Sequence, residues 1–176
     1  MMLALAGAAA QAQPTFTFMA HTLQLKSYNQ TSKPSWEFVP PNETVDNWTT
    51  MLTAIERADA HTQKDVDGMA EGIMSVYKSN KAQILMAKTM QAANGQPYNY
   101  MVAAFEEPAR HRFELNFVKM ALGGKNGYTL VYSVRIGDPN YLAKSKAFLS
   151  QHSGEIGDAL AKTNPPDFGT LPRKVF

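Results

Sequence analysis

The sequence predicts a single α+β domain, in which a mainly antiparallel sheet of about six to seven strands carries two packed helices. Three observations predict this class. Several segments have the two-residue period of strands, two segments have the apolar spacing of amphipathic helices, and turn signals separate consecutive strands. The length of 176 residues suits one domain, and a hydrophobic content of 44% supports a packed core and excludes a wholly disordered chain.

Residues 1–12 form an apolar, uncharged leader that ends in Ala10-Gln11-Ala12. This tripeptide has the small-x-small form that signal peptidase accepts, so we expect cleavage after it, a periplasmic or secreted protein, and one domain over residues 13–176. The leader is too short to span a hydrocarbon core of about 30 Å, so we expect no stable membrane span. The basic residues that normally begin a signal peptide are missing, so either the true start lies upstream of Met1 or the signal is atypical. The alternative interpretation is an apolar leader without a targeting role, or a short helix packed on the domain.

Two N-terminal segments alternate as strands do. Residues 15–26 place Phe16 and Phe18 on one face and resume the same period further on, so we expect one strand there. Residues 35–39 form a shorter strand with both aromatic residues on one side. The two prolines that follow cannot continue a ladder, so this strand ends before them.

Residues 47–57 can be interpreted as a helix or as a strand. The apolar residues from Trp48 to Ile55 recur at i, i+3, i+4 and i+7, which is typical of an amphipathic helix. The same stretch is rich in threonine, tryptophan and isoleucine, which favour strands. Periodicity alone cannot decide over so short a segment.

Residues 63–79 are predicted to form the first helix. Thr62 followed three residues later by Asp65 resembles a capping box. Gly68 and Gly72 lie on or near the apolar stripe, and since each costs up to about 1 kcal/mol relative to alanine, we expect close packing on the sheet to explain them. The apolar residues at helical spacing are Val66, Met69, Ala70, Ile73, Val76 and Tyr77.

Four strands in two hairpins are predicted next. Residues 83–91 and 98–106 flank Asn94-Gly95, a signal for a type I′ turn. Residues 112–122 and 128–136 flank a longer, glycine-rich loop. Both arms of the second hairpin carry apolar rows, which is what an antiparallel sheet with one buried face requires.

The last helix is predicted to follow directly, with Asp138 as its N-cap and Pro139 in its first turn. Gly154 and Gly157 are expected to bend or interrupt it. The two prolines after Asn164 end it, and the remaining tail is expected to be extended.

This order of elements, together with the segment Trp48-Thr49-Thr50-Met51-Leu52-Thr53, resembles small exported bacterial proteins of the PsbP-like fold. In that family a tryptophan-led strand precedes the first helix, and a four-strand meander leads into a C-terminal helix. The resemblance covers residues 16–162 and favours a strand at 48–56 for the ambiguous segment. It implies a PsbP-like sandwich with an accessory or binding role and no shared active site, so no functional residue is transferred from the family.

Residue types that carry chemistry are scarce. The absence of cysteine excludes disulfides, zinc–thiolate sites and thiol catalysis. The four histidines form no H-x-H or H-x-x-x-H pair and no nucleotide-binding motif is present, so we expect no metal and no cofactor. The net charge is only +2 without a dense basic run, which argues against nucleic-acid binding.

The strongest candidate for a binding surface is the charged turn between the predicted strands at 98–106 and 112–122, formed by Glu106, Glu107, Arg110, His111 and Arg112. As a functional site it would bind an anion or an acidic partner, with a histidine tuned by a carboxylate. The alternative, which we favour, is a solvated charged turn between two strands.

The sequence therefore predicts an exported, non-catalytic binding or accessory protein that acts on an unknown protein partner or small ligand. One alternative is an immunity-type protein that neutralises a toxin outside the cytoplasm. Another is an enzyme with an unrecognised site near His111. Neither the ligand nor the oligomeric state follows from the sequence.

Overall fold

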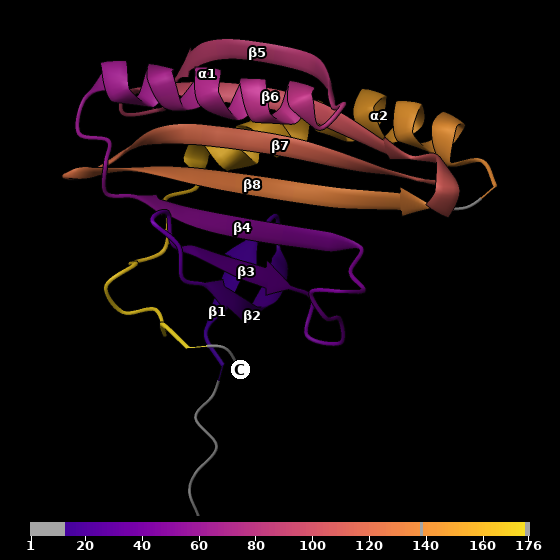
Figure 1. Cartoon of the computed structure of the whole chain (residues 1–176), viewed down its shortest axis with the longest axis horizontal. Helices are drawn as coiled ribbons and strands as arrows, with labels where there is room; N and C mark the ends of the chain where they lie inside the picture. The colour runs from indigo at the N-terminus through magenta and orange to yellow at the C-terminus, as the bar shows by residue number, and fades with distance from the viewer. Residues whose placement is uncertain (1–12, 138, 175–176) are drawn as a thin grey trace, which may run out of the picture.

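One curved antiparallel sheet with a helix on each face forms the structure (Figure 1), a computed structural model that describes residues 13–137 and 139–174. The strand order is β1-β2-β3-β4-β8-β7-β6-β5. The α+β class and the two helices on one antiparallel sheet are confirmed, but the sheet has eight strands rather than six to seven. In chain order the elements are β1 (Thr15–Phe18), β2 (His21–Asn29), β3 (Ser35–Val39), β4 (Thr50–Arg57), α1 (Gln63–Ser79), β5 (Gln83–Gln91), β6 (Pro97–Glu107), β7 (Arg112–Gly123), β8 (Asn126–Gly137) and α2 (Tyr141–Lys162).

The eighth strand arises because the segment expected to be one strand is a hairpin. Met19 and Ala20 have φ angles of 49° and 63°, and they reverse the chain so that Phe18 pairs with His21. The apolar alternation continues on both sides of this turn, so periodicity cannot detect it. Neither turn residue is a glycine or asparagine, the residues that normally signal a positive φ.

The two helices cover opposite faces of the sheet because side chains alternate along each strand. Tyr100 and Val102 belong to the core that contains Ile156 of α2, whereas Met101 packs with Val66 of α1. In Figure 1, α1 lies in front of the sheet and α2 behind it. The face that α1 shares is only partly covered, since this helix lies against β5, β6 and β7.

The sheet curls strongly on the α2 side. Phe18 in β1 and Tyr132 in β8 are separated by four strand positions in the sheet order, yet their ring centroids are 4.6 Å apart. A flat sheet with a spacing of about 4.8 Å per strand would separate them by about 19 Å. The C-terminal tail closes this side, because Trp36 Nε1 donates to the Pro172 carbonyl oxygen at 2.9 Å and its ring packs on Phe168.

A lysine is buried in the same core. Lys119 is 3% exposed, and its Nζ donates to the carbonyl oxygens of Thr163 at 2.8 Å and Ala161 at 3.3 Å, where α2 ends. The ammonium also lies over the rings of Tyr98 and Tyr128, 5.3 and 5.6 Å from their centroids. Burial lowers the pKa of Lys119 to about 8.

Of the ambiguous segment, Thr50–Arg57 forms a strand, two residues later than the predicted start at Trp48. Trp48 itself precedes β4 and packs with Val39 and Met51. The helix at 63–79 is confirmed together with its capping box at Thr62. The hairpin at Asn94-Gly95 is not type I′, because only the glycine has a positive φ, of 79°, whereas that turn requires two such residues.

The last helix begins later than predicted. Its N-cap is Asn140 rather than Asp138, which lies outside the described residues. The helix continues through Gly154 and Gly157, contrary to expectation. Gly157 has a packing role instead, because a Cβ there would lie 3.3 Å from the Tyr100 hydroxyl.

The leader at residues 1–12 also lies outside the described residues, so its cleavage remains a prediction. Neither helix in the described part of the chain is long and apolar enough to cross a membrane.

Candidate functional site

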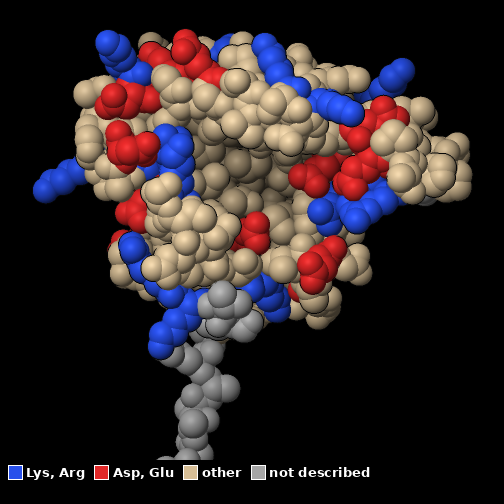
Figure 2. Space-filling model, viewed as in Figure 1, with Lys and Arg blue, Asp and Glu red and all other residues tan. Residues whose placement is uncertain are grey.

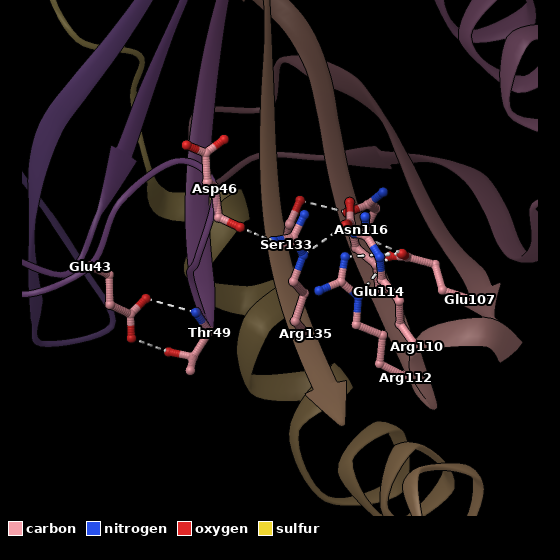
Figure 3. A network of polar contacts seen from close by, with 10 residues as sticks. All are labelled: Glu43, Asp46, Thr49, Glu107, Arg110, Arg112, Glu114, Asn116, Ser133 and Arg135. Atoms are coloured by element: carbon pink, nitrogen blue, oxygen red, sulfur yellow. Dashed lines mark hydrogen bonds and ion pairs between the residues drawn. The ribbon is translucent and has the colours of Figure 1, made fainter. Parts of the chain in front are cut away.

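The charged turn singled out by the sequence lies between β6 and β7, where the short 3₁₀ helix η1 (Pro108–Arg110) reverses the chain. Arg112 donates two hydrogen bonds to the Glu107 carboxylate, from Nε to Oε1 at 2.9 Å and from Nη2 to Oε2 at 3.0 Å (Figure 3). Arg110 Nη1 lies 3.4 Å from the same carboxylate. The hydrogen bonds from Arg112 hold the pKa of Glu107 below its ordinary value.

The other two residues of the turn contact α2. Glu106 points to the opposite face from Glu107, and its Oε1 accepts a hydrogen bond from the Tyr141 hydroxyl at 2.9 Å. His111 has a left-handed φ of 48°, and its ring centroid lies 6.3 Å from that of Tyr141. Within the described residues the His111 ring forms no ion pair with a carboxylate. The structure therefore brings the arginines together with Glu107 but leaves the histidine apart from them.

A second arginine–carboxylate pair extends the network across the sheet. Glu114 in β7 and Arg135 in β8 are opposite each other in the register, and their side chains approach to 3.3 Å. The Arg135 guanidinium also stacks on the Trp48 ring, 3.7 Å from its centroid. Sequence reasoning missed this pair because its members are 21 positions apart and only the strand register makes them neighbours.

Polar side chains continue from this network towards α1. Asn116 and Ser133 are opposite each other on β7 and β8, are 4% and 5% exposed, and are joined by a hydrogen bond from the serine hydroxyl to the amide oxygen. Tyr77 of α1 lies close to Asn116, and burial followed by the nearby charge of Glu114 raises the pKa of Tyr77 to about 12. The network thus runs from the η1 turn to the helix.

This network is well suited to fixing strand ends and poorly suited to binding an added anion. Each of Arg110, Arg112 and Arg135 already lies within 3.4 Å of a carboxylate oxygen, so an incoming anion would have to displace it. Within the described residues no three histidine, aspartate or glutamate side chains are close enough to hold a metal ion. A binding function at the turn and an enzyme site near His111 both remain predictions.

A larger candidate site lies beside the network, on the face that α1 only partly covers. Figure 2 shows this face hollowed below α1, and a cavity of about 550 Å³ lies between the helix and the residues Lys33, Arg57 and Asp59. We call it the α1 cavity. Tyr77 lines one end, so the α1 cavity adjoins the polar network.

Two glycines give the α1 cavity its depth. Gly68 and Gly72 line it one turn apart, and a Cβ at either position would meet no atom within 4 Å. The expected close packing of these glycines on the sheet is therefore wrong. They face open space, and the helix backbone forms part of the cavity wall. The sequence did contain a signal for this site, in the spacing of the two glycines, but the same spacing is also typical of close packing.

The charges around the α1 cavity are not balanced locally. Asp59 is bound by Arg57 through two hydrogen bonds of 2.9 Å, which lowers the pKa of Asp59 to about 2. Asp65 is engaged in the capping box of α1. In the described part of the chain, Lys33 and Lys64 form no ion pair and their ammonium groups make no hydrogen bond. The charged residues that line the α1 cavity, Lys33, Arg57 and Lys64 against Asp59 and Asp65, therefore give it a net formal charge of +1.

The opposite wall is apolar. Met69, Ile73 and Val76 of α1 line the α1 cavity, and Val76 is 57% exposed. Exposed aliphatic surface beside free cations is suited to a ligand with an apolar body and an anionic group.

A comparison of the chain with protein-family models found no match, and a comparison with curated proteins found no significant similarity. The resemblance to PsbP-like proteins therefore remains a prediction.

Proposed function

We propose that this protein is an exported, non-catalytic binding protein and that the α1 cavity receives a small amphipathic anion. The observation that carries the proposal is the combination, in one cavity of about 550 Å³, of two unpaired lysines with an exposed apolar wall. Ligand sites commonly have volumes of about 300–1,000 Å³ and combine mostly apolar walls with a few charged or polar groups.

The two halves of such a ligand would find different partners. Lys33 and Lys64 supply positive charge to the α1 cavity, whereas Ile73 and Val76 supply apolar contact along the helix. Because both lysines are solvated, each contributes modestly, by about 0.2–1 kcal/mol, and the apolar contact has to supply much of the affinity.

The test uses anilinonaphthalene sulfonate, a fluorescent probe with an anionic group on an apolar body. Gly72→Leu adds a side chain where the α1 cavity is open, so we expect the affinity for the probe to fall by about tenfold or more. Gly72→Ala is the matched control, since it changes the helix backbone in the same way without filling the cavity. It should bind within about twofold of the unaltered protein.

Charge is tested separately. The double variant Lys33→Ala, Lys64→Ala should bind the probe about three- to tenfold more weakly and with a smaller dependence on salt concentration. Lys78→Ala is the control, because Lys78 is an exposed lysine of the same helix outside the cavity. If both the leucine variant and the double lysine variant bound the probe as the unaltered protein does, the α1 cavity would not be the binding site.

Export is tested by N-terminal sequencing of the protein recovered from the periplasm or the medium. We expect a mature chain that begins at Gln13, because the small-x-small tripeptide precedes it. A recovered chain that still began at Met1 would contradict cleavage, and recovery from the cytoplasm alone would contradict export.

A further inference from the structure

A second cavity lies on the opposite face of the sheet, between α2 and the outer strands β5, β6 and β7. Its volume is about 310 Å³, and we call it the α2 cavity. Ala104, Phe113 and Leu115 from the sheet and Leu142 and Leu149 from α2 line it. The sheet residues belong to or pack against the core on the α2 side, so this cavity is separated from the α1 cavity by the thickness of the sheet.

A β-bulge in the edge strand β5 directs the Leu85 side chain towards the α2 cavity. The register between β5 and β6 shifts between Ile84 and Met86, so Leu85 is an extra residue without a partner in the ladder. Ile84 packs on the α1 side, whereas Leu85 lines the α2 cavity and Met86 pairs with Val102 of the α2-side core. The bulge thus presents two successive apolar residues to one face, and bulges of this kind are common beside functional sites because they redirect side chains.

The apolar residues at this mouth are unusually exposed. Leu85 and Leu142, which line the cavity, are 45% and 50% exposed, and Met86, next to Leu85 in β5, is 42% exposed. Val76, in the α1 cavity, is the other large hydrophobic residue with comparable exposure in the described part of the chain. Exposed apolar side chains grouped around an apolar opening indicate a surface that gains free energy when a ligand covers it.

One polar group inside the wall has no partner. Ser145 lines the α2 cavity, is 4% exposed, and its buried Oγ makes no hydrogen bond within the described structure. A buried hydroxyl without a partner carries a free-energy cost that a ligand oxygen can remove.

The charges at the rim of the α2 cavity cancel. Glu106 and Lys146 both line it, one of each sign, and Glu106 also accepts a hydrogen bond from Tyr141. Leu115, Phe113 and Leu149 line the inner part of the α2 cavity, where the Ser145 hydroxyl is the polar group and is uncharged. Burying an ion there would be costly, because a buried charge needs a charged or strongly hydrogen-bonded partner.

From these observations we infer that the α2 cavity binds a short, neutral aliphatic molecule with one oxygen, such as an aliphatic alcohol. The chain lies against Leu115, Leu142 and Leu149, Leu85 closes over it, and its oxygen accepts a hydrogen bond from the Ser145 hydroxyl. This site is independent of the α1 cavity and takes a ligand of different charge.

The test is a titration of the ¹⁵N-labelled protein with octanol, followed by NMR. Octanol should produce saturable shifts confined to β5, β6, β7 and α2, whereas octanoate should bind at least about tenfold more weakly because its charge would be buried. Ser145→Ala should weaken octanol binding by about three- to tenfold through loss of the hydrogen bond. Ser145→Leu should abolish binding by filling the cavity, and Gly72→Leu in the α1 cavity should leave it unchanged.

Ser145→Leu could fail to fold, so Leu142→Gln provides a second test of the same site. Leu142 is half exposed, and its replacement leaves the core intact. It should weaken octanol binding several-fold. The inference is overturned if octanol gives no saturable shifts, if the shifts lie on α1, or if Ser145→Leu and Leu142→Gln both bind octanol normally. Equal binding of octanoate and octanol would overturn the neutral ligand, and normal binding by Ser145→Ala would overturn the role of its hydroxyl.

Discussion

Replacing Gly68 and Gly72 with alanine should stabilise the protein, because both glycines lie inside α1 with open space beside them. Glycine costs about 0.5–1 kcal/mol relative to alanine within a helix, since the unfolded chain gains more backbone freedom at glycine. Nothing in the folded state opposes the change, as a Cβ at either position would meet no atom within 4 Å. We therefore expect each substitution to raise the free energy of unfolding by about 0.5–1 kcal/mol, and the double variant by about 1–2 kcal/mol.

Urea denaturation followed by circular dichroism measures this effect. The midpoint should rise with an unchanged slope, and the melting temperature of the double variant should rise by about 2–8 °C for a chain of this size. Gly154→Ala in α2 is a positive control, since a Cβ there also meets nothing within 4 Å. Gly127→Ala is the opposite control, because its Cβ would lie 2.7 Å from the Ala60 Cβ, and it should destabilise the protein.

The outcome tests the geometry of the α1 cavity directly. If Gly154→Ala stabilised the protein while Gly68→Ala and Gly72→Ala destabilised it, these two glycines would be packed against the sheet after all. The α1 cavity would then be absent, and the argument for ligand binding there would be refuted.

Three further predictions concern stability. Thr62→Ala should lower the free energy of unfolding by about 1 kcal/mol through loss of the N-cap of α1, and Thr62→Ser should restore it, as urea midpoints would reveal. Glu107→Gln should cost about 1 kcal/mol near neutral pH, and because its pKa is lowered in the folded state, the deficit should shrink as the pH falls below about 4.5. For Lys119 the folded pKa of about 8 is below the unfolded value of 10.5, so the unfolded chain binds more protons between them. This difference adds about 2 kcal/mol of stability from pH 8 to pH 10, whereas tyrosines such as Tyr77, Tyr100 and Tyr128, whose folded pKa values are raised to about 12, lower stability over the same range. Relative to a Lys119→Met variant, the unaltered protein should therefore gain about 2 kcal/mol between pH 8 and pH 10 in urea denaturation, and a constant difference between the two proteins would contradict the assignment.

Local interactions in the sequence were sufficient for several elements. The helix over residues 63–79 was predicted with the bounds found in the structure, because Thr62 and Asp65 form a capping box through neighbouring backbone groups and the apolar spacing repeats every turn. The strand over residues 83–91 was also predicted with its observed bounds. These signals depend on residues a few positions apart, so they can be recognised in the sequence without knowledge of the fold.

Packing between distant segments decided the rest of the architecture. Helical spacing and strand-forming residues compete over residues 47–57, and the strand is formed because β4 pairs with β3 on one side and β8 on the other, which satisfies its backbone groups. The hairpin between β1 and β2 was missed for a related reason. Its turn at Met19 and Ala20 is imposed on residues that do not favour a positive φ, and tertiary pairing supplies the compensation.

Local sequence patterns were enough to predict the α+β class, the helix over residues 63–79, most strands of the meander and the cluster of charge around Arg112. The Glu114–Arg135 ion pair could not be predicted in this way, since it depends on the register of β7 and β8. The tertiary structure also decided where the surface is open. Gly72 faces a cavity and not the sheet, because α1 covers only part of its face, and no local pattern records how far a helix extends over a curved sheet.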